Sequence, residues 1–271
     1  MKFGLEIVPI GYYSDPRKIV ELAVIAEAAG WEGIWLWDMV FFPYGIGDPW
    51  ISLAAAANAT NTLKLITGVT PVPRYSPHNL ARMLAGLDIL SQGRMIFGAG
   101  LGVPSEYRTS SENYNNKDLA EIMDESLEFI TQYHSGEKFT KKGKYFTASD
   151  VQLVPKPVQS PRIPIWIGGD SHAALKRASK WDGWIIGTVN EQKEITKTPE
   201  QLNKQVDYIK NEKPNNNFVE IVIDGISEAG EKSLVNEYSE AGATWWFECI
   251  FATRGSPEEM VNRVKKGPPN R

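Results

Sequence analysis

Two glycine-rich segments of the sequence are suited to bind an anion. They are Gly98-Ala99-Gly100-Leu101-Gly102 and Gly168-Gly169-Asp170-Ser171. Backbone N–H groups at the start of a helix bind anions, and a glycine has no Cβ to block the approach. The glycine spacing of the first segment departs from the dinucleotide-binding fingerprint. The second segment therefore suits a phosphate better, provided that Asp170 turns its charge outward. A tight β-to-α connection without any ligand explains each segment equally well.

Two aromatic segments and one acid add to the residues that could hold a flat ligand. Residues 37–44 include one Trp, two Phe and one Tyr, and residues 67–75 run from Thr-Gly-Val to Pro-Arg-Tyr. Asp38 is the only acid at the end of its predicted strand, and burial among aromatic residues would perturb its pKa. A buried Asp38 that only accepts hydrogen bonds from backbone N–H groups is the alternative interpretation. Together the segments favour a large planar ligand with an anionic tail.

The histidines and the strand-end lysines favour no other chemistry. His78, His134 and His172 show no HxH, HExxH or carboxylate-cluster spacing, so we expect no metal site. The sequence has no Gly-x-Ser-x-Gly motif and no plausible Ser/His/Asp set. Lys2 and Lys64 fall at predicted strand starts, the wrong end for a Schiff-base lysine in a barrel.

A strand followed by a helix recurs along the chain, and this repeat must position the glycine and aromatic segments. Strands are predicted to start near residues 3, 32, 63, 94, 164, 183, 218 and 244. Eight such units predict an α/β fold, a single (β/α)8 TIM barrel, with a doubly wound open sheet as the alternative. In such a barrel ligands bind at the carboxyl ends of the strands, where these segments lie.

The units are predicted to form one domain, residues 1–271, with one insertion between the fourth and fifth strands. The insertion, at about residues 104–160, is expected to hold a helix and a rim hairpin around Lys142-Gly143. Two later helix starts match the capping box: Thr198 and Ser256 each precede a proline and lie three residues before Gln201 and Glu259.

Composition narrows the class of protein. The chain has 271 residues, of which 42% are hydrophobic and 23% charged, as is typical of a globular protein. A net charge of -4 implies no basic face, so no nucleic-acid partner is expected. The N-terminus lacks the layout of a signal peptide, and the apolar stretches are too short to cross a membrane. Cys249 is the only cysteine, which fits a reducing compartment, so we expect a soluble cytoplasmic protein.

Four groups of residues, in the same order along the chain, resemble a known family. They are Ala28–Asp38, Asp48–Trp50, Leu90–Arg94 with Gly98–Gly102, and Pro164–Gly169 with Trp181–Trp184. With them the chain resembles the luciferase-like monooxygenase family of flavin-dependent oxidoreductases over most of its length. The family fold is the (β/α)8 barrel, which agrees with the count of strand–helix units.

The resemblance implies a cofactor, either FMN or the deazaflavin coenzyme F420, with its ring in the barrel mouth. A non-proline cis peptide often supports this ring, and here it would fall within Thr67-Gly68-Val69. The cofactor phosphate would meet Gly100, Leu101 and Gly102 on one side and Gly168, Gly169, Asp170 and Ser171 on the other. The sequence departs from the family at two positions. Met39 stands where many deazaflavin members have a catalytic His, and Leu101 where luciferase-type FMN members have an Arg.

The resemblance also implies roles for other residues at the rim. Asp38 is the expected catalytic residue, which hydrogen-bonds the cofactor or orients the substrate. Glu106 and Tyr107 are expected to close over the cofactor. An apolar substrate pocket is expected from Met39, Phe41, Phe42, Tyr44, Trp50, Trp246 and Phe251.

These expectations favour a flavin-dependent oxidoreductase or monooxygenase acting on a small organic substrate. Two alternatives stay open: a flavin-binding carrier barrel without turnover, and a phosphate-binding barrel with lyase or isomerase chemistry. The family commonly forms dimers, so a homodimer is expected, and a separate reductase is a further candidate partner.

Overall fold

The computed structural model describes residues 1–42, 45–107, 114–190, 192–213 and 219–269. Eight parallel strands in this part of the chain close into a barrel in the order β1-β10-β9-β8-β7-β4-β3-β2. Because the sheet closes on itself, the predicted TIM barrel is confirmed and the open sheet is wrong. The barrel strands are β1 (Lys2–Ile7), β2 (Gly33–Leu36), β3 (Lys64–Pro71), β4 (Met95–Gly100), β7 (Ile165–Gly168), β8 (Gly183–Ile186), β9 (Glu220–Gly225) and β10 (Trp245–Ile250). The start predicted at residue 218 lies outside the described residues.

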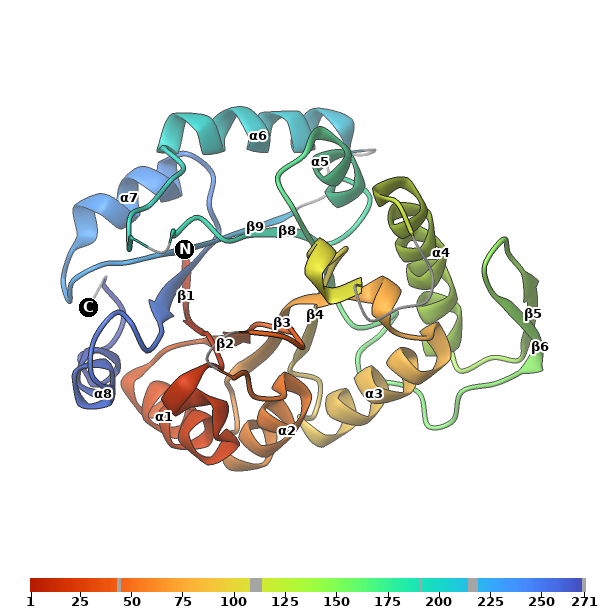
Figure 1. The fold of residues 1–271 in the computed structure, drawn as a ribbon, viewed down its shortest axis with the longest axis horizontal. Helices are drawn as coiled ribbons and strands as arrows, with labels where there is room; N and C mark the ends of the chain where they lie inside the picture. The colour runs from red at the N-terminus through yellow and green to blue at the C-terminus, as the bar shows by residue number, and fades with distance from the viewer. Residues whose placement is uncertain (43–44, 108–113, 191, 214–218, 270–271) are drawn as a thin grey trace.

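Helices surround the strands on all sides (Figure 1). They are α1 (Pro16–Ala29), α2 (Pro49–Ala59), α3 (Pro77–Leu90), α4 (Asn116–His134), α5 (His172–Ala178), α6 (Pro199–Glu212), α7 (Lys232–Glu240) and α8 (Pro257–Lys265). The capping boxes predicted at Thr198 and Ser256 are both present, with Pro at the first helical position. Such caps satisfy backbone N–H groups that a helix start leaves without partners.

Strand side chains alternate between the barrel interior and the helix layer. On β10, Trp245 stacks on Phe247 inside the barrel, with ring centroids 5.2 Å apart. Trp246, between them, instead packs against Tyr238 of α7 at 5.6 Å. The interior cluster consists of Trp35, Ile66, Ile96, Trp166, Ile185, Val222, Trp245 and Phe247. These large side chains fill the barrel, so a ligand has room only above them at the carboxyl ends of the strands.

The predicted rim hairpin is formed by β5 (Phe139–Lys142) and β6 (Thr147–Val151), which pair antiparallel. In Figure 1 the hairpin projects outside the ring of helices, beyond α4. Its turn is attached to α4 by Glu125, whose carboxylate accepts the backbone N–H groups of Lys144, Tyr145 and Phe146. The predicted insertion between the fourth and fifth barrel strands is therefore confirmed.

None of the helices in the described ranges combines the length and the apolar character that a membrane crossing requires.

Candidate active site

A cavity of about 620 Å³ opens at the carboxyl ends of the strands. This size falls within the range of small-molecule and cofactor sites. Most of the predicted cofactor residues line it: Asp38, Gly68, Val69, Gly100, Leu101, Gly102, Glu106, Gly168, Gly169 and Ser171. A smaller cavity of about 230 Å³ adjoins it and shares Trp37, Gly68, Val69, Gly168 and Gly169 as lining residues. The structure therefore brings both glycine segments and Asp38 to one mouth.

The floor of the mouth is an irregular stretch of β3. The peptide bond between Gly68 and Val69 is cis, within the segment where the sequence predicted such a bond, and the β3–β4 register shifts between Thr67 and Thr70. The indole Nε1 of Trp35 donates a hydrogen bond to the Gly68 carbonyl at 2.5 Å. Thr67 Oγ1 accepts the Gly98 N–H at 3.1 Å. These contacts hold the Gly68–Val69 peptide at the wall of the cavity.

Two of the mouth glycines leave space for the Val69 side chain. A Cβ on Gly168 would lie 2.6 Å from Val69 Cγ1, and one on Gly100 would clash with Val69 Cγ2. Real Cβ atoms do not approach other carbon atoms so closely. Close packing around Val69 thus explains why glycine is needed at both positions, whatever ligand binds there.

Polar groups gather at the α5 side of the mouth, where the sequence predicted a phosphate. Ser171 is the N-cap of α5. Arg177, in the last turn of the same helix, lines the cavity and forms an ion pair with Asp124 of α4. Asp170 points to Lys197, whose Nζ lies 3.1 Å from a carboxylate oxygen, and to Gln205. Asp170 is therefore paired outside the main cavity, which it does not line, although it lines the smaller adjoining one. Its predicted direct contact with the cofactor stays untested.

Asp38 lies in a buried group of charges at the opposite side of the mouth. Arg74 lies between two acids and forms ion pairs with both Asp38 and Glu106. The acids' side chains are 3% and 0% exposed, against 17% for Arg74. Tyr75 Oη donates to Asp38 at 3.1 Å, and Trp50 Nε1 donates to it at 3.3 Å. The alternative of an Asp38 bound only to backbone N–H groups is therefore wrong.

The charges of this group set the state of Asp38. Burial raises the pKa of Asp38, although Arg74, Tyr75 and Trp50 each stabilise its ionised form. Glu106 accepts the backbone N–H of Val40 at 3.1 Å as well as its bond from Arg74. One guanidinium thus balances two carboxylates at the wall of the cavity. Arg74 was not predicted as a site residue, although its place between Pro73 and Tyr75, as a cation in an aromatic rim loop, indicates such a role.

Comparison with known proteins agrees with this geometry. The model of the luciferase-like monooxygenase family matches residues 5–211 of the chain. The chain belongs to this family.

Curated luciferase-like relatives include two deazaflavin enzymes. An F420-dependent hydroxymycolic acid dehydrogenase of Mycobacterium tuberculosis is 31% identical over 176 residues, which are 62% of this chain and 48% of the relative. An F420-dependent glucose-6-phosphate dehydrogenase of Amycolatopsis mediterranei is 31% identical over 193 residues, which are 66% of this chain and 57% of the relative. The chain spans about half the length of the curated relatives it matches.

Solved luciferase-like structures share the fold over the whole chain. The monooxygenase RslO1 from Streptomyces bottropensis has a TM-score of 0.80 at 21% identity and covers 98% of this chain and 97% of its own. The oxygenating constituent of 3,6-diketocamphane monooxygenase from Pseudomonas putida, in complex with FMN, has a TM-score of 0.79 at 15% identity and covers 98% and 96%. At these identities the likeness establishes the barrel fold alone.

The predicted substrate residues of the luciferase-like barrel do not all lie together. Met39 lines the main cavity, and Phe41 lines a neighbouring cavity of about 440 Å³ that Glu106 and Tyr107 also border. Tyr107 Oη donates to the Leu101 carbonyl, so Tyr107 lies beside the predicted phosphate segment. Three further predicted substrate residues come from the same part of the chain. Trp50 donates a hydrogen bond to Asp38, Phe42 is half-buried, and Tyr44 lies outside the described residues.

Two predicted substrate residues lie elsewhere. Trp246 is fully buried, and its Nε1 donates to Glu248 at 3.2 Å on the helix side of the barrel. Its position on β10, one residue from inward-facing Trp245 and Phe247, gives it the opposite orientation. Phe251 follows β10 and lines neither the main cavity, nor the smaller adjoining one, nor the neighbouring cavity that contains Phe41. Period-two alternation, applied to β10, would have excluded Trp246.

This placement predicts the effect of changing Trp246. Trp246→Phe should leave cofactor affinity unchanged, because the indole faces α7 and not the cavity. Trp37→Phe should weaken it, because Trp37 lines both mouth cavities. Equilibrium titration of both purified variants with coenzyme F420 and FMN measures the difference. A loss of affinity in the Trp246 variant equal to that of the Trp37 variant would contradict the placement.

Proposed function

We propose that the protein is an oxidoreductase that binds reduced coenzyme F420 or FMN in the barrel mouth and reduces or oxygenates a small organic substrate there. The observation that carries the proposal is the mouth itself. A cis Gly68–Val69 peptide forms its floor, glycines from β4 and β7 border that floor, and the Asp38–Arg74–Glu106 group forms one wall. The names of the curated F420-dependent relatives support F420 over FMN.

The described residues fit such a cofactor. Where the ring would lie, Gly68, Gly100 and Gly168 contribute backbone and no side chain. At the α5 side, the N–H groups next to Gly169, the Ser171 hydroxyl and Arg177 would bind the phosphate. When bound, the cofactor supplies the redox chemistry as a hydride donor or, for FMN, as the site of oxygen activation.

The side chains of the chain then have separate tasks. Asp38 would hold the substrate or the ring edge through its buried carboxyl group, whose position Arg74, Tyr75 and Trp50 fix. Met39 cannot transfer a proton, so a proton for the reaction must come from another residue. Tyr107, bound to the Leu101 carbonyl, would limit the access of water to the phosphate side.

Titration of the purified protein tests the proposal. We expect oxidised F420 or FMN to bind with a micromolar or lower Kd, and riboflavin, which lacks the phosphate, to bind more weakly. Binding of neither cofactor would overturn the proposal. Binding without any acceleration of re-oxidation of the reduced cofactor over the free cofactor would favour the carrier barrel. Binding of sugar phosphates alone would favour the lyase or isomerase barrel.

We also propose a homodimer, located in the cytoplasm and supplied with reduced cofactor by a separate reductase. Exposed apolar side chains on neighbouring helices support the dimer: Val24 on α1, Ile51 on α2, and Ile89 and Leu90 on α3. The single cysteine, a buried thiol, supports a reducing compartment. Sedimentation equilibrium tests the dimer, and a monomer at micromolar concentration would overturn it.

A further inference from the structure

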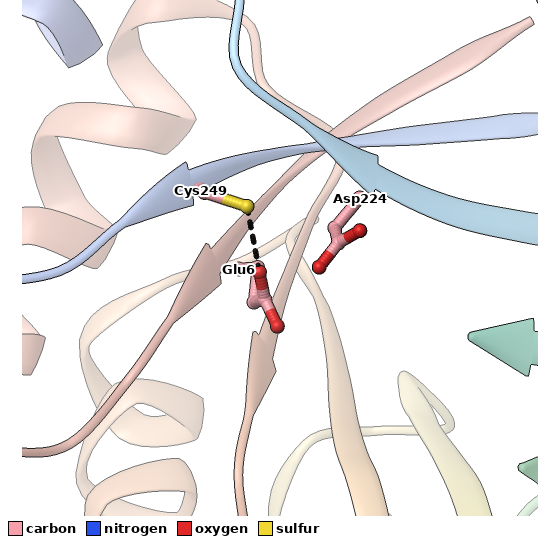
Figure 2. A group of neighbouring side chains, drawn as sticks. All are labelled: Glu6, Asp224 and Cys249. Carbon is pink, nitrogen blue, oxygen red and sulfur yellow. Dashed lines mark hydrogen bonds between the residues drawn. The ribbon is translucent and has the colours of Figure 1, made fainter. Parts of the chain in front are cut away.

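Three buried side chains occupy a part of the barrel mouth to which the proposed function assigns no role. Glu6, Asp224 and Cys249 come from β1, β9 and β10, which are neighbours in the barrel, and none is more than 2% exposed. Figure 2 shows the three side chains pointing into one space, and one oxygen or sulfur atom of each lies within 4.8 Å of the others. No Lys, Arg or His of the described chain pairs with either carboxyl group. Two carboxyl groups therefore share a buried space without a cationic side chain from the described residues.

The hydrogen bonds around these carboxyl groups are unequal. Asp224 Oδ1 accepts both the backbone N–H and the hydroxyl of Thr188, the hydroxyl at 2.7 Å. Glu6 accepts from Trp37 Nε1 at 2.5 Å and from the weak thiol donor of Cys249 at 2.8 Å. The Thr188 N–H donates to Asp224 Oδ1, and the Thr188 hydroxyl is shared between this oxygen and the Asp224 backbone carbonyl, so Thr188 favours the ionised form of Asp224. The proton of the pair therefore belongs on Glu6.

Burial and charge act in the same direction. Burial raises the pKa of Glu6 well above its ordinary value, and the negative charge of Asp224 raises it further. Burial also raises the pKa of Asp224, while the donors of Thr188 oppose that rise. Burial, together with the nearby acids, raises the pKa of the Cys249 thiol, so Cys249 stays a neutral donor. Two adjacent buried carboxyl groups cannot both ionise at low cost, which favours one proton shared by the pair.

The protonated group faces the space proposed for the cofactor. Glu6 lines the smaller mouth cavity together with Gly68, Val69, Gly168 and Gly169. The mouth thus contains two pairs of acids that are neutralised differently. Arg74 balances the pair Asp38 and Glu106, whereas one shared proton would balance the adjacent acids Glu6 and Asp224.

We propose that Glu6 donates a proton to the substrate in the mouth, and that Asp224 is a positioning residue that keeps this proton on Glu6. The inference deepens the proposed function, on which it rests, by assigning the substrate class: an acceptor with a polarised C=O or C=N bond. A substrate carbon takes the hydride, and the π electrons move to the oxygen or nitrogen. That atom takes the proton from Glu6, so the substrate gains two electrons and two hydrogens while the cofactor is oxidised. Glu6 then regains a proton from solvent.

Infrared spectroscopy of the cofactor-free protein tests the state of the pair. We expect the C=O stretch of a protonated carboxyl group at neutral pH, lost in Glu6→Gln and retained in Asp207→Asn, whose acid is exposed on α6. In Asp224→Asn the pH at which this band disappears should fall by about one unit or more, because the neighbouring charge is gone. Absence of the band from the wild-type protein, or its persistence in Glu6→Gln, overturns the inference. So does a stoichiometric divalent metal ion in the purified protein without the band.

A second measurement separates this inference from the proposed function. Addition of oxidised F420 or FMN should shift the frequency of the Glu6 band, because the carboxyl group would face the bound ring. Tight cofactor binding without a shift overturns the donor role and leaves the proposed function intact. A band in a protein that binds neither cofactor overturns the proposed function and the donor role with it. If Asp224→Asn fails to fold, Glu6→Gln alone decides the assignment of the band.

Discussion

Replacement of Arg74 by methionine is expected to lower the free energy of unfolding by about 3–5 kcal/mol at pH 7. Arg74 is the shared ion-pair partner of Asp38 and Glu106, whose side chains are 3% and 0% exposed. Without the guanidinium, two carboxylates stay buried with their mutual repulsion and without a cation. Urea denaturation of the wild type and the variant measures the loss. The exposed Arg17, whose side chain is 86% accessible and pairs with Asp15, provides the matched control Arg17→Met, which should leave the free energy of unfolding nearly unchanged.

The loss should depend on pH in a defined direction. Burial already raises the pKa of Asp38 above its ordinary value, and removal of Arg74 removes an interaction that opposes this rise. The folded-state pKa of Asp38 in the variant therefore moves further above the unfolded value. Such a group contributes its full stability below the unfolded pKa and loses it as the pH rises through the folded pKa. The deficit of Arg74→Met should be smallest near about pH 4 and grow toward neutral pH. A deficit that is constant with pH, or equal to that of Arg17→Met, would contradict this account.

Local sequence signals predicted the elements well because they act over a few residues. Pro after Thr198 or Ser256, with Gln or Glu three residues later, specifies a capped helix start without help from the rest of the chain. Gly30 ends α1 in the left-handed conformation, with φ of 86°, which glycine adopts more readily than other residues. Eight repeats of such strand–helix units then leave few topologies, the barrel and the doubly wound open sheet, and the structure shows the barrel.

The sequence predicted which segments meet at the mouth, whereas the roles of their residues toward a ligand stay predictions. Asp38 and both glycine segments lie at the mouth because strand ends in a parallel barrel must meet there. The role of the glycines could not be read from the sequence, since the side chain that requires them, Val69, comes from a different strand than Gly100 and Gly168. An anion-binding turn and a packing glycine look alike in a single sequence.

Pairs formed by barrel closure were out of reach of the sequence analysis. Glu6 and Cys249 are 243 residues apart and meet only because β1 and β10 close the barrel. A lone acid in a predicted strand gives no sign of its partner. Alternation along β1 would nevertheless have placed Glu6 on the interior face, since Leu5 and Ile7 on either side of it face the helix layer. A charged residue at an interior position of a strand is therefore a signal worth following to its neighbours across the sheet.

Substitution of Gly168 by alanine is expected to weaken cofactor binding roughly 10- to 100-fold, which corresponds to about 1.4–2.7 kcal/mol. The new Cβ would lie 2.6 Å from Val69 Cγ1, and a β-branched side chain has little freedom to turn away. Val69 must then shift and carry with it the Gly68–Val69 peptide, the floor proposed to support the ring. Fluorescence titration with F420 or FMN measures the affinity. The matched control is Gly86→Ala on α3, where a Cβ meets nothing within 4 Å; its affinity should not change.

A second substitution should reverse the loss. In the double variant Val69→Ala with Gly168→Ala, both Cγ atoms are gone, and the nearest remaining Val69 atom, Cβ, lies 3.4 Å from the new Cβ, an ordinary contact. The double variant should therefore bind the cofactor more tightly than Gly168→Ala alone, a positive coupling in a double-mutant cycle. If instead Gly168 acts by leaving room for the cofactor itself, removing the Val69 methyl groups restores nothing and the two losses add. The sign of the coupling thus decides whether packing against Val69 or the bound ligand requires a glycine at position 168.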